Sequence, residues 1–169
     1  MKGIVFSLFN RLVEEKFGYD AWDQLLTSVN PASEGIYTSG QNYDDQELMA
    51  LVSALSAQTH IPINDLVRTF GEYMFPHLAT AHPVFLENQP TLKDFLKTVH
   101  DVIHVEVRKL FKNASLPVIE YQDDASDQLT MLYRSPRKLC HLSEGLIQGA
   151  ASHYNTSVEI NHPICMHDG

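Results

Sequence analysis

The fold is decided by LKDFLKTVHDVIHVEVRKLFKNASLPVIEYQ (residues 92–122), where the spacing of apolar side chains changes from helical to extended. In the first part, apolar residues recur every three or four positions, as on one face of a helix. The members of this face are Leu96, Val99, Ile103, Val107 and Leu110. From Leu116 onward the pattern is that of a strand. The stretch therefore predicts a long helix over residues 92–112, followed by the first strand of a sheet.

Upstream of this stretch, the sequence predicts mostly helix. Apolar residues recur at helical spacing from Val5 to Leu12, and Gly18 would end this first helix. Further helices are expected at residues 19–29, 44–59 and 61–78, with Pro76 breaking the last of them. The turn-rich segment at residues 30–45 is expected to be a loop.

Downstream, the sequence predicts a small sheet and one more helix. Residues 116–122 and 127–135 would form a hairpin, followed by a helix at 136–154 and a last short strand at 156–162. Helices first and a small antiparallel sheet later predict the α+β class. A chain of 169 residues, 44% of them hydrophobic, can bury one core. We expect a single domain over residues 1–169, with a helical part at about 1–65 and a second part at about 66–169.

Composition narrows the class of protein. The formal net charge is −9 and the isoelectric point is about 5.3, which argues against a nucleic acid or an anionic membrane as partner. The amino terminus lacks the apolar core and cleavage site of a signal peptide, and no apolar run is long enough to span a bilayer. Two cysteines, Cys140 and Cys165, are typical of a reduced protein. We therefore expect a cytoplasmic protein that binds neither nucleic acid nor membrane.

Two histidines, His100 and His104, lie one turn apart on the long predicted helix, at the edge of its apolar face. A histidine in such a place can be a partly buried core residue, a surface residue or a metal ligand. A zinc site through both would need two further ligands, and no HExxH pattern accompanies them. The helix alone leaves these alternatives open.

A basic cluster stands out in this acidic chain, at MLYRSPRKL (residues 131–139). Ser135 followed by Pro136 is typical of the start of a helix, with Ser135 as its cap. The hydroxyls of Tyr133 and Ser135, the Arg137 guanidinium and the free amides of a helix start all favour an anion. The simpler alternative is a capped helix whose arginine pairs with a nearby acidic side chain.

Together, these elements resemble the H-NOX family of haem nitric oxide/oxygen-binding domains, shared by bacterial proteins and soluble guanylate cyclase. The likeness covers almost the whole chain: the opening MKGIVF, the helix HDVIHVEVRKLF, the LP that follows, and Y-x-S-x-R at residues 133–137. It implies the H-NOX fold and a haem b whose proximal iron ligand is His104. It also implies that Tyr133, Ser135 and Arg137 hold the haem propionates, and that Pro117 presses on the porphyrin and helps to distort it.

The resemblance also bears on the choice of gas. Oxygen-binding relatives carry a distal tyrosine nine residues after the tyrosine of Y-x-S-x-R, where this chain has Leu142. The positions that match the distal wall are all apolar: Val5, Phe9, Met74, Leu142 and Leu146. Bound oxygen is stabilised by a hydrogen-bond donor, whereas nitric oxide binds ferrous haem strongly without one. This wall therefore favours nitric oxide, with oxygen bound weakly or not at all. Leu142 and Leu146 would also suit a plain helix core, and Tyr73 or Tyr154 would supply a donor under a different alignment.

Cys140, His162 and Cys165 resemble the cysteine and histidine cluster that binds zinc in some proteobacterial relatives. A closed structural zinc site takes four ligands, and the further cysteine of those relatives has no counterpart before Gly169. His167 is one substitute for it, and a truncated carboxy terminus is the other explanation. Two unrelated free cysteines are the alternative to a zinc site.

The expected function is a sensor rather than an enzyme. Nitric oxide, with carbon monoxide as a second ligand, would bind ferrous haem and break the bond between iron and His104. The released helix would then move relative to the amino-terminal helices as the haem flattens against Pro117. The resemblance suggests a separate partner, either a histidine kinase or a cyclic-di-GMP enzyme. Two alternatives are an oxygen sensor of the same fold and a zinc or thiol redox-sensing module without haem. A haem peroxidase would need distal acid–base residues, which the expected distal wall lacks.

Overall fold

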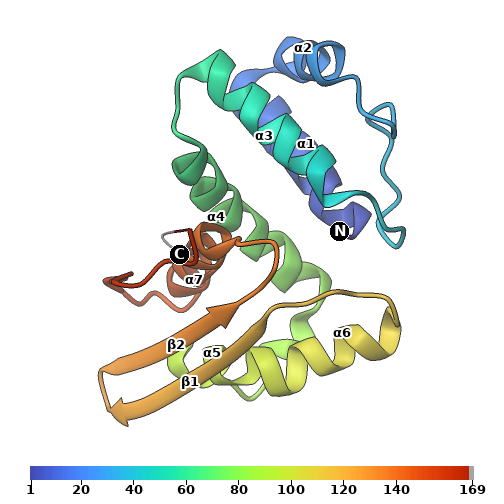
Figure 1. Ribbon diagram of the computed structural model, residues 1–169. Coiled ribbons are helices and arrows are strands. Elements are labelled where there is room, and N and C mark those ends of the chain that lie inside the picture. The colour runs from blue at the N-terminus through green and yellow to red at the C-terminus, as the bar shows by residue number, and fades with distance from the viewer. Residues whose placement is uncertain (168–169) are drawn as a thin grey trace.

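The computed structural model describes residues 1–167, and its first half is helical, as expected (Figure 1). The helices are α1 (Gly3–Phe17), α2 (Tyr19–Val29), α3 (Asp45–Thr59) and α4 (Ile63–Ala81). The first three form one end of the molecule, and α4 runs from them through its centre. Asp44 caps α3 by accepting a hydrogen bond from the Gln46 amide, and acidic side chains in its first turn favour the positive end of the helix dipole.

The second half contains the sheet and the remaining helices, and it makes the fold α+β. Its elements are η1 (Pro83–Phe85), α5 (Leu92–Thr98), η2 (Val99–Ile103), α6 (His104–Leu110), β1 (Val118–Ala125), β2 (Gln128–Arg134) and α7 (Cys140–His153). β1 and β2 pair antiparallel, with Ile119 opposite Tyr133, and the hairpin lies alongside α5 and α6 (Figure 1). The expected hairpin is therefore confirmed.

Two apolar clusters meet along α4 and α7. Phe9, Phe70 and Met74 belong to the cluster formed mainly by α1, α3 and the first part of α4. Phe75 and Phe95 belong to the second cluster, with the end of α7. A partly buried side chain of α7, Leu146, packs against both clusters. The boundary expected near residue 65 falls at the start of α4, and the division of the chain there stays a prediction.

Glycines bring the backbones of α4 and α7 into close contact. A Cβ at Gly145 would lie 1.9 Å from the carbonyl oxygen of Arg68, and a Cβ at Gly71 would lie 2.4 Å from that of Leu142. Only a residue without a side chain fits at such a crossing. The two helices therefore form a closely packed pair at the centre of the fold.

Pro76 and the long helix differ from the expectation. α4 continues through Pro76 to Ala81, because the packing of α7 along it outweighs the loss of one backbone hydrogen bond at the proline. The segment from Leu92 to Leu110 is α-helical at both ends but forms a π-helix, η2, in between. A π turn holds one more residue than an α turn, so it changes the direction in which the following side chains point.

The start of α7 and the last expected strand are also corrected. Ser135 does not cap a helix: it begins a turn in which its carbonyl accepts from the Lys138 amide at 3.1 Å, and Lys138 has a left-handed φ of 51°. α7 therefore begins only at Cys140. Residues 156–162 form no strand, since no neighbouring strand within residues 1–167 pairs with them. No helix in the described part of the chain has the length and apolar character needed to cross a membrane.

Candidate functional site

His104 begins α6, directly after the π-helical turn, and the residue is half-buried. Its Nδ1 atom is buried and has no hydrogen-bond partner among residues 1–167. Burial, with smaller contributions from the nearby His100 and Arg108, lowers the pKa of His104 to about 4, and the backbone of Pro117 opposes this shift. The imidazole is therefore neutral at pH 7, which is the form that binds a metal.

Pro117 immediately precedes β1 and lies beside the helix that carries His104. Two residues further on, the amide of Ile119 donates a hydrogen bond to Nδ1 of His100 at 3.3 Å. This contact joins the π-helical turn to the strand. The structure thus brings together His104 and Pro117, and the contact of Pro117 with a porphyrin stays a prediction.

Tyr133, Ser135 and Arg137 lie together where β2 ends in the turn before α7. Ser135 is 5% exposed, and its hydroxyl accepts a hydrogen bond from the Arg137 amide at 3.2 Å. Burial raises the pKa of Tyr133, and a contact with the Ser135 hydroxyl opposes this. A serine hydroxyl, a tyrosine hydroxyl and a guanidinium are therefore close to one another at the end of the strand.

The Arg137 guanidinium already holds an anion. It donates to the carboxylate of Asp45, at the start of α3, and to the carbonyl of Ser115. Asp45 also pairs with the amino group of Met1 at 2.6 Å. Burial alone would raise the pKa of Asp45, but the hydrogen bonds from Arg137 and Met1 lower it. The position thus accepts a carboxylate, and the pairing of Arg137 with an acidic side chain, the simpler reading of the sequence, occurs in the structure.

The five expected wall residues lie on α1, α4 and α7. Phe9 and Met74 are 1% and 4% exposed, and the other three, Val5, Leu142 and Leu146, pack against the same cluster. Of the two alternative donors, Tyr154 packs in the second cluster. Tyr73 precedes Met74 on α4, packs against the same cluster as the wall residues, and also lines a surface pocket with Lys16 and His153. The five wall residues themselves are apolar.

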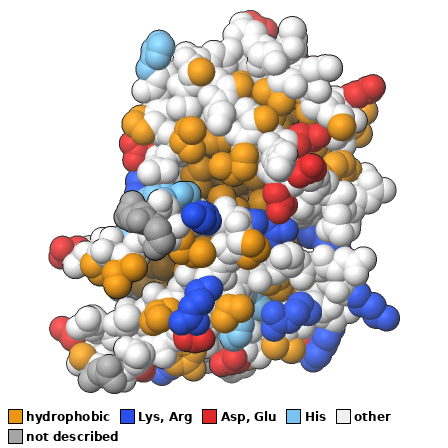
Figure 2. Space-filling model, viewed as in Figure 1, with side chains coloured by type: hydrophobic (Ala, Val, Ile, Leu, Met, Phe, Trp, Pro, Cys, Tyr) orange, Lys and Arg blue, Asp and Glu red, His pale blue; other side chains and the backbone are white. Residues whose placement is uncertain are grey.

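These groups suit a flat apolar molecule that carries carboxylates and a metal. Figure 2 shows hydrophobic side chains gathered in the recess between the helical end of the molecule and the hairpin. His104 offers an unpartnered ring nitrogen, and the Ser135–Arg137 turn offers a carboxylate position. An iron porphyrin needs these two kinds of contact around an apolar disc. The residues present therefore fit haem.

A second cluster, of possible metal ligands, lies where the tail returns to the start of α7. The Sγ atoms of Cys140 and Cys165 are 3.6 Å apart, and ligand atoms of His141 and His167 join them, all within 4.8 Å of one another. Burial and the neighbouring Cys165 raise the pKa of the Cys140 thiol. The cluster contains two cysteines and two histidines, which is a common set for structural zinc.

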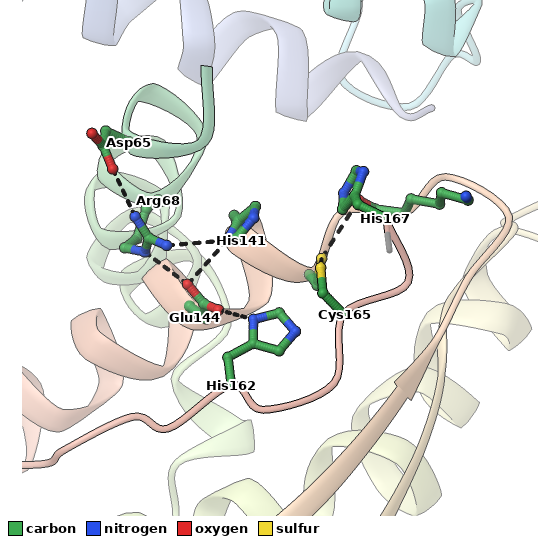
Figure 3. A network of polar contacts seen from close by, with 9 residues as sticks. Asp65, Arg68, His141, Glu144, His162, Cys165 and His167 are labelled. Carbon is green, nitrogen blue, oxygen red and sulfur yellow. Dashed lines mark hydrogen bonds and ion pairs between the residues drawn. The ribbon is translucent and has the colours of Figure 1, made fainter. Parts of the chain in front are cut away.

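His162 lies outside this cluster, which corrects the expected set of ligands. Its Nδ1 contacts the carboxylate of Glu144 on α7 (Figure 3). Glu144 also accepts from Arg68 Nε at 2.7 Å and lies 3.2 Å from His141 Nδ1. Cys165 and His167 lie on the other side of His141. His141 was missed by sequence reasoning, although it directly follows Cys140.

Comparisons with known proteins agree on one family. A family model described as Haem-NO-binding matches residues 2–162. A crystal structure of an H-NOX protein from S. oneidensis in the Fe(II)NO ligation state is 36% identical, spans 100% of this chain and 93% of that chain, and has a TM-score of 0.93.

Two other similar structures differ in organism or ligation state. An Fe(II) unliganded H-NOX protein from K. algicida is 37% identical over 95% of this chain and 87% of that chain, with a TM-score of 0.90. An NMR structure of an H-NOX domain from Shewanella oneidensis in the Fe(II)CO state is 36% identical and has a TM-score of 0.89. The match covers 99% of this chain and 92% of that chain. Among curated proteins, none matches significantly.

Proposed function

Because this chain belongs to the haem-NO-binding (H-NOX) family, a fold that binds haem and senses a diatomic gas, we propose that it is a nitric oxide sensor that holds haem b through His104. The observation that carries this proposal is the half-buried, neutral imidazole of His104, whose buried Nδ1 lies on a ring that contacts the backbone of Pro117. A neutral ring at pH 7 is available to iron without first losing a proton.

Other residues of the chain would hold the cofactor by its edge and its faces. Ser135 and Arg137 would bind a propionate, with Tyr133 beside them, and Arg137 would then share its guanidinium between that propionate and Asp45. Pro117 would contact the porphyrin on the side of His104. When bound, the haem iron supplies a site for a diatomic gas.

The apolar wall favours nitric oxide over oxygen. Val5, Phe9, Met74, Leu142 and Leu146 carry no hydrogen-bond donor in their side chains. Bound oxygen gains from such a donor and nitric oxide binds ferrous haem without one. The structures from S. oneidensis with NO and with CO support these two gases as ligands.

Signalling would begin with the release of His104. Without a bond from His104 to iron, α6 would be free to move away from Pro117, and the π-helical turn before it would give that movement a place to start. A surface change of this kind can be read by a separate protein. We propose that this partner is a histidine kinase or a cyclic-di-GMP enzyme. The net charge of the chain itself is −9. The domain itself would sense and would not catalyse.

Replacement of the proximal histidine tests the proposal. The His104→Gly variant should lose the protein ligand to iron, and added imidazole should restore the spectrum of the ferrous protein. His82→Gly, an exposed histidine outside the site, is the matched control and should behave like the wild type. A His104→Gly variant whose haem spectrum matches that of the wild type without imidazole would disprove the assignment.

We also propose zinc at Cys140, His141, Cys165 and His167, because their ligand atoms converge within 4.8 Å. Zinc would bring two thiolates and two imidazoles into one tetrahedral site. Metal analysis of purified protein should give one zinc per chain, and Cys165→Ser should lose it. His162→Ala should keep its zinc, because His162 contacts Glu144 instead. Retention of zinc by Cys165→Ser, or its absence from the wild type, would contradict this second proposal.

A further inference from the structure

His100 lies one turn before His104, within the π-helical turn η2, and its Nδ1 accepts a hydrogen bond from the backbone amide of Ile119 in β1 at 3.3 Å. To accept, Nδ1 must carry no proton, so the proton of the neutral ring is on Nε2. The rings of His100 and His104 meet edge to face, with centroids 6.1 Å apart. The side chain therefore touches both the strand and the neighbourhood of His104.

This hydrogen bond connects the helix to the parts of the chain that face the cofactor. Ile119 is two residues after Pro117 and lies opposite Tyr133 in the hairpin. One edge of a strand in a two-stranded sheet has amides that no other strand pairs with. When a side chain of the helix accepts a hydrogen bond from such an amide, it fixes the distance between the helix and the strand.

The segment that His100 occupies is the π-helical part of the helix. A π turn is less stable than an α turn and persists where surrounding contacts support it. None of the residues of η2 is fully buried, and two of them, Val99 and Ile103, pack against the second apolar cluster. Further back, Lys97 of α5 pairs with Asp123 of β1 at 2.7 Å. Among the described hydrogen bonds between helix and strand, that of His100 is closest in sequence to His104.

We propose that His100 is a positioning residue for His104. Its hydrogen bond to Ile119 holds the π turn in place over β1, and this limits how far His104 can move from the iron when nitric oxide binds. The inference rests on the proposed haem site, and it assigns to His100 a role that needs no contact with haem. Loss of the acceptor should loosen the turn and let His104 leave the iron more readily.

Three variants test the role of the acceptor. His100→Phe keeps a ring but removes the acceptor, and His100→Ala does so without added bulk if the Phe variant fails to fold. His100→Asn restores an acceptor, since the Asn Oδ1 can take the place of Nδ1. His82→Phe, at an exposed site, is the matched control for a histidine replaced by phenylalanine.

Two readouts separate the hydrogen bond from its consequence. Hydrogen exchange at the Ile119 amide should become about five-fold faster in His100→Phe, since one hydrogen bond is lost. In the haem-loaded ferrous protein, the iron–histidine stretching band in the resonance Raman spectrum should shift, and the complex with nitric oxide should lose His104 several-fold faster. His100→Asn should return both readouts toward the wild type, and His82→Phe should leave both unchanged.

The outcomes are distinct. Faster exchange at Ile119 with an unchanged iron–histidine band and an unchanged rate would show that His100 only stabilises the strand, and the inference would fail while the proposed function stood. Unchanged exchange at Ile119 would refute the hydrogen bond itself. If purified protein took up no haem, or His104→Gly showed no change, the proposed function would fail, and the role of His100 with it.

Discussion

The close crossing of α4 and α7 predicts that Gly145→Ala destabilises the protein and disturbs the apolar wall. The new methyl group would lie 1.9 Å from the carbonyl oxygen of Arg68 and 2.9 Å from the Cα of Gly71. An ordinary contact needs about 3.5 Å, so the helices would have to separate by more than about 1 Å. Both near atoms belong to backbone, which cannot rotate away as a side chain would.

The net cost combines two opposing effects. Overpacking of this kind costs about 3 kcal/mol, while alanine gains about 1 kcal/mol over glycine inside a helix. The difference is about 2 kcal/mol, which lowers the Tm of a chain of this size by about 4–8 °C. Leu142 and Leu146 lie on the same helix, so we expect the variant also to lose haem faster.

Urea and thermal unfolding followed by circular dichroism measure this cost. Gly40→Ala is the matched control, because its nearest neighbour, a side-chain atom of Phe111, would be 3.9 Å from the new Cβ. We expect the control to unfold within about 0.5 kcal/mol of the wild type. A Gly145→Ala variant with an equal or higher Tm would show that the backbones of α4 and α7 do not lie as close as described.

Three further predictions concern the site. The cofactor-free protein should lose stability as pH falls from about 6.5 to about 4. The pKa of His104 is about 4 in the folded chain and 6.5 in the unfolded chain. The unfolded chain therefore binds the proton more readily over this range, which favours unfolding. The loss should be on the order of 2 kcal/mol after allowance for partial exposure, and His104→Leu should remove it in urea unfolding at each pH. Arg137→Ala should lower the free energy of unfolding by on the order of 1 kcal/mol, because the pairing with Asp45 is lost. Haem should also transfer faster from this variant to an acceptor protein. An unchanged transfer rate would argue against a propionate at Arg137. Leu142→Tyr should strengthen oxygen binding about ten-fold by adding one buried hydrogen bond, as measured by oxygen titration of the ferrous protein, and no gain would mean that Leu142 does not face the gas.

Local patterns predicted most of the fold. The helix at residues 19–29 and the hairpin follow from the spacing of apolar residues, which depends on neighbours a few positions away. The order of helices and sheet then gave the α+β class. The resemblance to H-NOX domains named His104, and the structure places this residue in a half-buried setting that favours a neutral ring.

Contacts between distant segments account for what the sequence did not show. Pro76 stays helical because α7 packs against α4, and residues 156–162 form no strand because a strand needs a neighbour. The π turn leaves the apolar spacing of residues 92–110 unchanged, so periodicity cannot detect it. His162 pairs with Glu144 rather than with Cys140, and only the packing of the tail on α7 decides between them.

The central claim is that His104 binds haem iron and releases it when nitric oxide binds. The visible absorption spectrum of purified ferrous protein, recorded before and after addition of nitric oxide, tests it most directly. We predict the spectrum of a ferrous haem with one histidine ligand, changing to that of a nitric oxide complex that has lost its histidine. A protein without a haem spectrum, or one whose nitric oxide complex keeps the histidine ligand, would contradict the claim.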